Sequence, residues 1–270
     1  MIIRAARPDD YAAFARLFTE LGVDEPTPSR DAFSRDLRPR MVVASEGSEG
    51  SEIMGYALHE LLDGFGYVRN LVTAPEHRRR GIGRALMEHL RELFTSHGAS
   101  SWCLNVMPSN TAAVRLYRDL GFELAYTSRA MRIPMDVALP QSDAPPLEVR
   151  PIEASMEAEL EHRFGLVPGQ LSSARTQHRD SDLLAFVVEG ETVGLAVFRA
   201  AFPGAFPFRL ERTDAAAPIL ETFRRRAPPR ARWVQVVVED DDALLQHLLE
   251  LGATVAMEFV HMRGLLRHTP

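Results

Sequence analysis

The stretch Ala74–Leu90, APEHRRRGIGRALMEHL, decides the fold more than any other part of this 270-residue chain. Three consecutive arginines precede two glycines, Gly81 and Gly83, that stand one residue apart. Apolar residues then recur at the spacing of one helix face: Leu86, Leu90 and Leu93. We therefore predict a tight turn followed by a helix that begins near Gly83.

Such a turn is suited to hold phosphate. A helix N-terminus leaves backbone N–H groups unpaired and carries partial positive charge. Glycine lets the backbone approach a ligand closely. Four arginines add positive potential around the turn: Arg78, Arg79, Arg80 and Arg84. The stretch therefore predicts a site for a ligand that carries phosphate.

Three classes of ligand compete for this site. A nucleoside triphosphate loop requires GK[ST], and the chain contains no lysine at all. A dinucleotide fingerprint requires G-x-G-x-x-G, and the run GIGRAL lacks the third glycine. Coenzyme A is the third class.

A second motif supports coenzyme A. R-R-R-G-I-G (Arg78–Gly83) resembles the Q/R-x-x-G-x-G/A signature of the GCN5-related N-acetyltransferase (GNAT) family, and Val68–His77 resembles the strand that leads into it. About thirty residues later, NTAAVRLYRDLGF (Asn110–Phe122) is similar to the N-x-x-A-x-x-x-Y-x-x-x-G-F segment of that family. The resemblance covers roughly residues 1–135. It implies an α/β fold, a mixed twisted sheet with flanking helices (the acyl-CoA N-acyltransferase fold).

The resemblance also implies site residues for acetyl-CoA. Backbone groups of Leu71, Val72 and Thr73 would pair with the pantetheine arm, and Asn110 and Ala113 would line the other side of the coenzyme. The pyrophosphate would contact the turn: Arg78, Arg79, Arg80, Gly81, Ile82, Gly83 and Arg84. Asn110 could equally serve as a helix cap. The nine histidines show no metal-binding pair, so we expect no metal.

The resemblance implies transfer of an acetyl group to a primary amine by direct attack in a ternary complex. Tyr117 matches the family tyrosine that acts as general acid on the departing thiolate and also contacts the coenzyme. The amine must lose a proton before it attacks. Glu60, Asp63 and His59 are candidate bases, although the two carboxylates are more typical of a solvated loop. Cys103 reads as a core residue.

The second half repeats the order of the first. Within Leu104–Arg132 and Val234–Arg263, an offset of 131 residues without a gap places Gly252 on Gly121 and Met262–Arg263 on Met131–Arg132. This indicates two tandem copies, although strand–helix–Gly–strand units of unrelated origin can look alike. We expect residues 1–139 to form the catalytic domain, 140–146 a linker and 147–270 a degenerate GNAT-like domain.

The second copy lacks the features of a coenzyme site. No glycine stands where the turn should be within Phe206–Phe223, and Asp214 and Pro218 occupy that region. Leu248 takes the position of Tyr117, and Asp241 that of Asn110. We expect this half to pack on the first and to shape the acceptor cleft.

Composition excludes other functions. The net charge is −6, so neither a nucleic-acid partner nor a basic surface is expected. No apolar run approaches the roughly 18 residues of a membrane span. The single cysteine and the absence of an N-terminal signal pattern favour a cytoplasmic location.

The sequence therefore predicts an acetyl-CoA-dependent N-acetyltransferase. Its acceptor would be a small-molecule amine or a protein N-terminus, and a homo-oligomer stays open. The alternative is a non-catalytic acyl-CoA-binding sensor or complex subunit. Tyr117 argues against it, because a protein that only binds acyl-CoA does not need a general acid.

Overall fold

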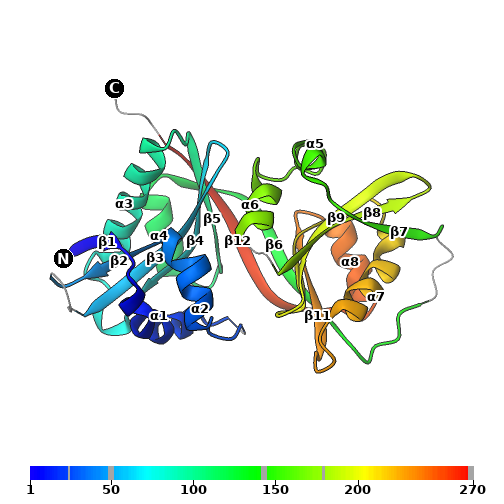
Figure 1. Cartoon of the computed structure of the whole chain (residues 1–270), viewed down its shortest axis with the longest axis horizontal. Helices are drawn as coiled ribbons and strands as arrows, with labels where there is room; N and C mark the ends of the chain where they lie inside the picture. Colours follow the sequence, from blue (N-terminus) through cyan, green and yellow to red (C-terminus); the bar gives the residue numbers. More distant parts are fainter. Residues whose placement is uncertain (24, 48–51, 141–144, 178–179, 267–270) are drawn as a thin grey trace. The chain divides into compact units, whose positions relative to one another are not determined.

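The computed structural model describes residues 1–23, 25–47, 52–140, 145–177 and 180–266 (Figure 1). Most of the expected linker, 140–146, lies outside the described residues. The chain divides into two compact units. Unit 1 comprises Met1–Val106, Asn110–Leu124 and the described chain from Met262; unit 2 comprises Met107–Ser109 and Ala125–His261.

Unit 1 is a sheet with helices on both faces. Its strands are ordered β1 (Ile2–Ala5), β2 (Met41–Ser45), β3 (Ile53–Leu62), β4 (Phe65–Thr73), β5 (Ser101–Val106) and the end of β12 (Thr254–Leu265). Strands β1 to β4 are antiparallel, whereas β4 and β5 are parallel. Its helices are α1 (Tyr11–Phe18), α2 (Arg30–Ala32), α3 (Ile82–Ser96) and α4 (Thr111–Asp119). The helix expected to begin near Gly83 is confirmed, since α3 begins at Ile82.

Alternation along the strands separates the two faces of this sheet. Tyr56 on β3 packs its ring against Phe14 of α1, with the centroids 5.5 Å apart. The neighbouring Gly55 faces the opposite way, because a Cβ there would lie 3.4 Å from Ile82 of α3. Helices α1 and α3 therefore cover opposite faces.

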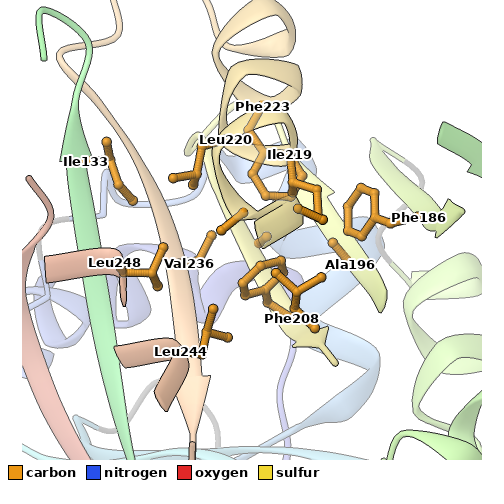
Figure 2. Close-up of a cluster of buried hydrophobic side chains, with 14 of the residues drawn as sticks. Ile133, Phe186, Ala196, Phe208, Ile219, Leu220, Phe223, Val236, Leu244 and Leu248 are labelled. Carbon is orange, nitrogen blue, oxygen red and sulfur yellow. The ribbon is translucent and has the colours of Figure 1, made fainter. Parts of the chain in front are cut away.

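Unit 2 repeats this plan. Its strands are ordered β12, β6 (Phe122–Pro134), β11 (Trp233–Glu239), β10 (Gly204–Leu210), β9 (Glu191–Arg199), β8 (Ser181–Val188) and β7 (Leu147–Pro151). Its helices are α5 (Glu157–Arg163), α6 (Gln170–Gln177), α7 (Ala216–Arg226) and α8 (Asp242–Glu250). The core cluster of buried apolar side chains joins α7 and α8 to the strands, with Phe223 stacked on Phe198 at 4.9 Å (Figure 2).

The units do not follow the contiguous division 1–139 and 147–270. Strand β6 groups with unit 2 because it pairs with β11 over seven residues, from Trp233↔Pro134 to Glu239↔Ser128. The chain from Met262 groups with unit 1, where the Leu266 N–H donates to the Ser100 carbonyl at 2.8 Å. Each unit thus contains a strand segment from the other half of the sequence.

Candidate functional site in unit 1

Strands β4 and β5 separate after four residue pairs. Their parallel ladder runs from Phe65↔Ser101 to Val68↔Leu104. A register shift between Leu58 and His59 on the β3 side leaves Arg69 as an extra residue in β4. Beyond that point β4 stays paired with β3, up to Thr73↔Gly55. In the part of the chain that is described, the β5-facing edge of Leu71, Val72 and Thr73 thus has no ladder partner.

The turn before α3 leaves its backbone donors free. The first N–H of the helix that donates a hydrogen bond is that of Ala85, which bonds to the Gly81 carbonyl at 3.0 Å. Among the described residues, none accepts a hydrogen bond from the N–H groups of Arg79 to Arg84. Arg79 and Gly81 both have positive φ, 62° and 81°. This conformation brings successive N–H groups together in the manner of an anion-binding nest.

The two glycines differ in what they require. A side chain at Gly81 would meet nothing within 4 Å, but its φ of 81° disfavours any other residue. Gly83 has no positive φ, and its Cβ would contact Leu116 at 3.4 Å and Leu71 at 3.8 Å. Only Gly81 is needed for backbone conformation. The Cβ position of Gly83 faces protein side chains, and the expectation that the two glycines let the backbone approach a ligand stays a prediction.

The arginines around the turn are engaged to different degrees. Arg78 pairs with Glu20 at 2.7 Å, and Arg84 donates to Asp119 at 3.3 Å. Arg80 donates to Nδ1 of His77 at 2.7 Å. Arg79 is exposed and pairs with none of the described residues. These partners hold most of the positive side chains near the turn, and Arg79 is available to a ligand.

One group of potential metal ligands lies beside the turn. Single ligand atoms of Glu52, Glu76 and His77 lie within 4.8 Å of one another. Arg16 already approaches both carboxylates, at 3.9 and 3.0 Å. Because Arg80 must donate to Nδ1 of His77, its Nε2 carries the proton and offers no lone pair. This group is an ion-pair cluster, and the expectation of no metal stays a prediction.

Helix α4 places the second motif. Asn110 is its N-cap, and its side chain accepts from the Ala113 N–H at 3.2 Å. Tyr117 is buried at 6% exposure and packs on Phe122, with the ring centroids 5.9 Å apart. Burial raises the pKa of the Tyr117 hydroxyl well above its usual range. The phenol is therefore protonated at neutral pH, as a general acid must be.

A buried charged cluster on β3 and β4 escaped the sequence reasoning. Glu60 is 5% exposed, and its carboxylate lies 2.6 Å from Arg40 and 3.3 Å from Arg69. Arg69 also lies over the ring of Tyr67, whose hydroxyl accepts from Asn105 at 2.9 Å. Glu60 is thus no solvated loop carboxylate, because Arg40 from the turn before β2 closes over it. Nothing local in the sequence marks that partner.

The other candidate bases are poorly suited. Asp63 is exposed. His59 packs edge-on against Phe94 of α3 at 5.7 Å, and burial lowers its pKa to about 4. The ring of Phe94 leaves no space for a side chain at Gly66 on β4, since a Cβ there would lie 2.2 Å from that ring. Cys103 is fully buried, which confirms its assignment to the core.

In unit 2 the corresponding elements lack the turn. Helix α7 follows the one-turn helix Thr213–Ala215. Arg212, just before that turn, pairs with Asp214 within it at 2.6 Å. Leu248, at the position of Tyr117, is fully buried in the core cluster (Figure 2). Asp241 caps α8 as Asn110 caps α4, accepting from the Leu244 N–H at 2.9 Å. Both helices then end at a glycine with φ near 85°, Gly121 and Gly252.

Comparison with known proteins agrees with this architecture. Residues 9–122 match the family model described as Acetyltransferase (GNAT) family. The ribosomal protein bS18-alanine N-acetyltransferase of Escherichia coli strain K12 is 32% identical over 82 residues, 30% of this chain and 55% of that protein. The match thus spans about half the length of that relative.

Solved structures match almost the whole chain. A GCN5-related N-acetyltransferase from Sphaerobacter thermophilus has a TM-score of 0.71 at 21% identity, covering 100% of this chain and 96% of that one. A tandem GNAT protein from the clavulanic acid biosynthesis pathway has a TM-score of 0.64 at 18% identity, covering 97% and 96%. At these identities the likeness shows the fold. No helix among the described residues combines the length and apolar character needed to cross a membrane.

Proposed function

Because residues 9–122 form a domain of the GNAT acetyltransferase family, in a chain that has this fold in two tandem copies, we propose that the protein transfers an acetyl group from acetyl-CoA to a primary amine. The coenzyme would bind in unit 1 and the transfer would occur in a ternary complex. The observation that carries the proposal is the meeting of two features: the β5-facing edge of β4 without a ladder partner, and the turn of free N–H groups that follows β4 directly.

Each feature matches one part of acetyl-CoA. The unpaired edge of Leu71, Val72 and Thr73 can bond the amides of pantetheine as an added strand would. The N–H groups from Arg79 to Arg84 can hold the pyrophosphate, with Arg79 free to pair with it. Ile82 lies within this run; Asn110 and Ala113, at the start of α4, would face the coenzyme from the β5 side.

The reaction forms one bond, breaks one bond and moves two protons. The amine nitrogen forms a bond to the thioester carbon, and the C–S bond breaks. A backbone N–H near Val72, on the edge of β4 that faces away from β3, can stabilise the oxyanion of the tetrahedral intermediate. Tyr117, protonated at neutral pH, donates a proton to the departing thiolate and recovers one from solvent.

The amine must arrive without its proton. Glu60 is a weak base, because two guanidinium groups stabilise its ionised form. Alkyl amines have a pKa of about 10 and must give up a proton before they attack. We therefore assign this proton transfer to water. The proposed acceptor is a small-molecule amine or a protein N-terminus, and the proposal does not choose between the two classes.

Calorimetry with acetyl-CoA tests the site. Wild-type protein should bind with micromolar affinity, and a Gly81→Glu/Gly83→Glu variant should lose binding because two carboxylates would repel the pyrophosphate. A folded wild type that ignores acetyl-CoA, other acyl-CoAs and free coenzyme A would overturn the proposal.

A thiol-release assay tests the chemistry. Tyr117→Phe should keep coenzyme affinity and lose about 10²-fold or more in kcat, as expected for a general acid. Tight acetyl-CoA binding without turnover on a broad panel of amines would instead favour the sensor.

A further inference from the structure

A cavity of about 210 Å³ lies in unit 2, where no function has been assigned. It is bounded by the ends of β10 and β11, the start of α8 and the end of α5. Five apolar side chains line it: Phe164, Phe208, Leu210, Val238 and Leu244. Phe208 and Leu244 also belong to the core cluster (Figure 2), so these walls are fixed by packing rather than by loops.

The cavity arises because β10 leaves β11 early. Their parallel ladder contains only Gly204↔Gln235 and Ala205↔Val236. A register shift between Ala205 and Phe208 follows, after which β10 continues alongside β9 up to Leu210↔Gly194. In unit 1, β4 and β5 separate in the same way at Arg69, and the coenzyme would bind between these strands. Unit 2 retains the separation but has no turn of free N–H groups after it.

Both arginines of the cavity are already occupied by carboxylates. Arg209 forms an ion pair with Glu239, and its other nitrogens donate to the carbonyls of Phe164 and Phe208, at 3.2 and 3.0 Å. Arg163 donates to both oxygens of Glu211, at 3.3 and 2.7 Å. Neither guanidinium is left for an anion such as phosphate.

One carboxylate of the cavity remains in excess. Two arginines stand against three acids, because Asp241 also lines the cavity. Asp241 accepts from the Leu244 N–H through Oδ1, and no arginine of the described chain forms an ion pair with it. The run Glu239–Asp242 adds further acids at the same strand end, and the charges of Glu191 and Glu159 reach Arg163 and help to raise its pKa. The cavity is apolar inside and negative at its rim.

We propose that this cavity is a second ligand site that binds a small organic cation, an ammonium on a compact apolar body, without coenzyme A. The apolar body would contact Phe164 and Phe208, and the ammonium would lie at Asp241. The site is independent of acetyl transfer in unit 1, so it stands or falls separately from the function proposed above.

Calorimetry on the full chain at about 0.15 M salt tests the site, since exposed charges beyond about 8 Å are then screened. The probe is 2-phenylethylammonium, with phenylacetate as the anion of similar size. We expect 2-phenylethylammonium to bind and phenylacetate not to bind.

Asp241→Asn is the decisive variant because asparagine caps a helix as well as aspartate does, so only the charge is lost. Affinity for 2-phenylethylammonium should fall about tenfold, the effect of about 1.4 kcal/mol. Asp242→Asn is the matched control. It removes the same charge from the next residue, whose side chain is 98% exposed and does not line the cavity. The affinity of this variant for 2-phenylethylammonium should stay within about twofold of that of the wild type. Glu211→Gln, which releases Arg163 into the cavity, should weaken binding independently.

The Gly81→Glu/Gly83→Glu variant separates the two sites. It should retain 2-phenylethylammonium binding while losing acetyl-CoA. Absence of ammonium binding, equal binding of phenylacetate, or equal loss in Asp241→Asn and Asp242→Asn would each overturn the proposal. Displacement of 2-phenylethylammonium by coenzyme A in the Gly81→Glu/Gly83→Glu variant would assign the cavity to acyl-CoA and overturn it as well.

Discussion

Two neighbouring glycines in the turn before α3 have different physical roles. Gly81 adopts a φ of 81°, where an L side chain is strained, whereas Gly83 lies in ordinary helical backbone and faces Leu116. Gly81→Ala should therefore destabilise unit 1 by about 1–2 kcal/mol. Gly83→Ala should be neutral or stabilising by up to about 1 kcal/mol, because alanine has the higher helix propensity. Urea unfolding measures both, and equal effects would contradict this assignment.

His59 makes stability depend on pH. Its pKa is lowered to about 4 by burial and by the Arg40 charge, from about 6.5 in the unfolded chain. The unfolded state thus binds more protons between these values, so stability is full above about pH 6.5 and falls as the pH drops toward 4. The loss should be about 3 kcal/mol at most.

The control for this effect is His59→Gln, which cannot titrate. Its unfolding free energy should vary less than that of the wild type between pH 6.5 and pH 4, as measured by urea unfolding at several pH values. Parallel pH profiles for the two proteins would show that other groups dominate.

At the scale of elements, α4 and α8 have the same cap geometry but a different charge at the cap. Asn110 and Asp241 accept the same hydrogen bond from the third residue of the helix, and each helix has nine residues. The hydrogen bond of the cap is thus retained in both copies, whereas Asn110 is neutral and Asp241 is an acid.

Asn110→Asp turns the first cap into the second. Stability should change little because both residues cap well. The dissociation constant for acetyl-CoA should rise several-fold, since a carboxylate would stand beside the phosphates. Asn110→Ser, which caps without charge, is the control and should retain affinity in calorimetry. Equal loss in the two variants would point to the amide itself as the contact.

At the scale of the whole molecule, the C-terminal strand segment is a structural part of unit 1. Gly264 of β12 packs so closely on unit 1 that a Cβ would lie 2.5 Å from Nε1 of Trp102. Trp102 is 1% exposed and cannot move aside at low cost. The last strand of the second half thus completes the core that supports the candidate site.

Gly264→Ala should lower the stability of unit 1 by about 1–3 kcal/mol through overpacking. The chain has only two tryptophans, so Trp102 fluorescence in a Trp233→Phe background reports unit 1 alone. The control Leu265→Ala, at a side chain that is 77% exposed, should change the midpoint little. An unchanged midpoint for Gly264→Ala would mean that this segment is not held against Trp102.

The sequence by itself predicted a tight turn, the helix that follows it and a candidate site in the first half. Period, glycine position and capping are properties of neighbouring residues, so the start of α3 could be predicted directly. Two motifs indicated a resemblance to the GNAT family. The internal repeat predicted a second copy, and α8 does lie at an offset of 131 residues from α4.

Only the tertiary structure decided what depends on distant partners. Arg40 reaches Glu60 across twenty residues, β6 joins β11 across about a hundred, and Gly264 meets Trp102 across more. The cavity of unit 2 depends on where β10 turns away from β11, which no local pattern encodes. Strand pairing and burial are set by the chain as a whole. They place Glu60, which the sequence suggests to be solvated, in a buried ion pair. They also give the degenerate second copy a candidate binding site.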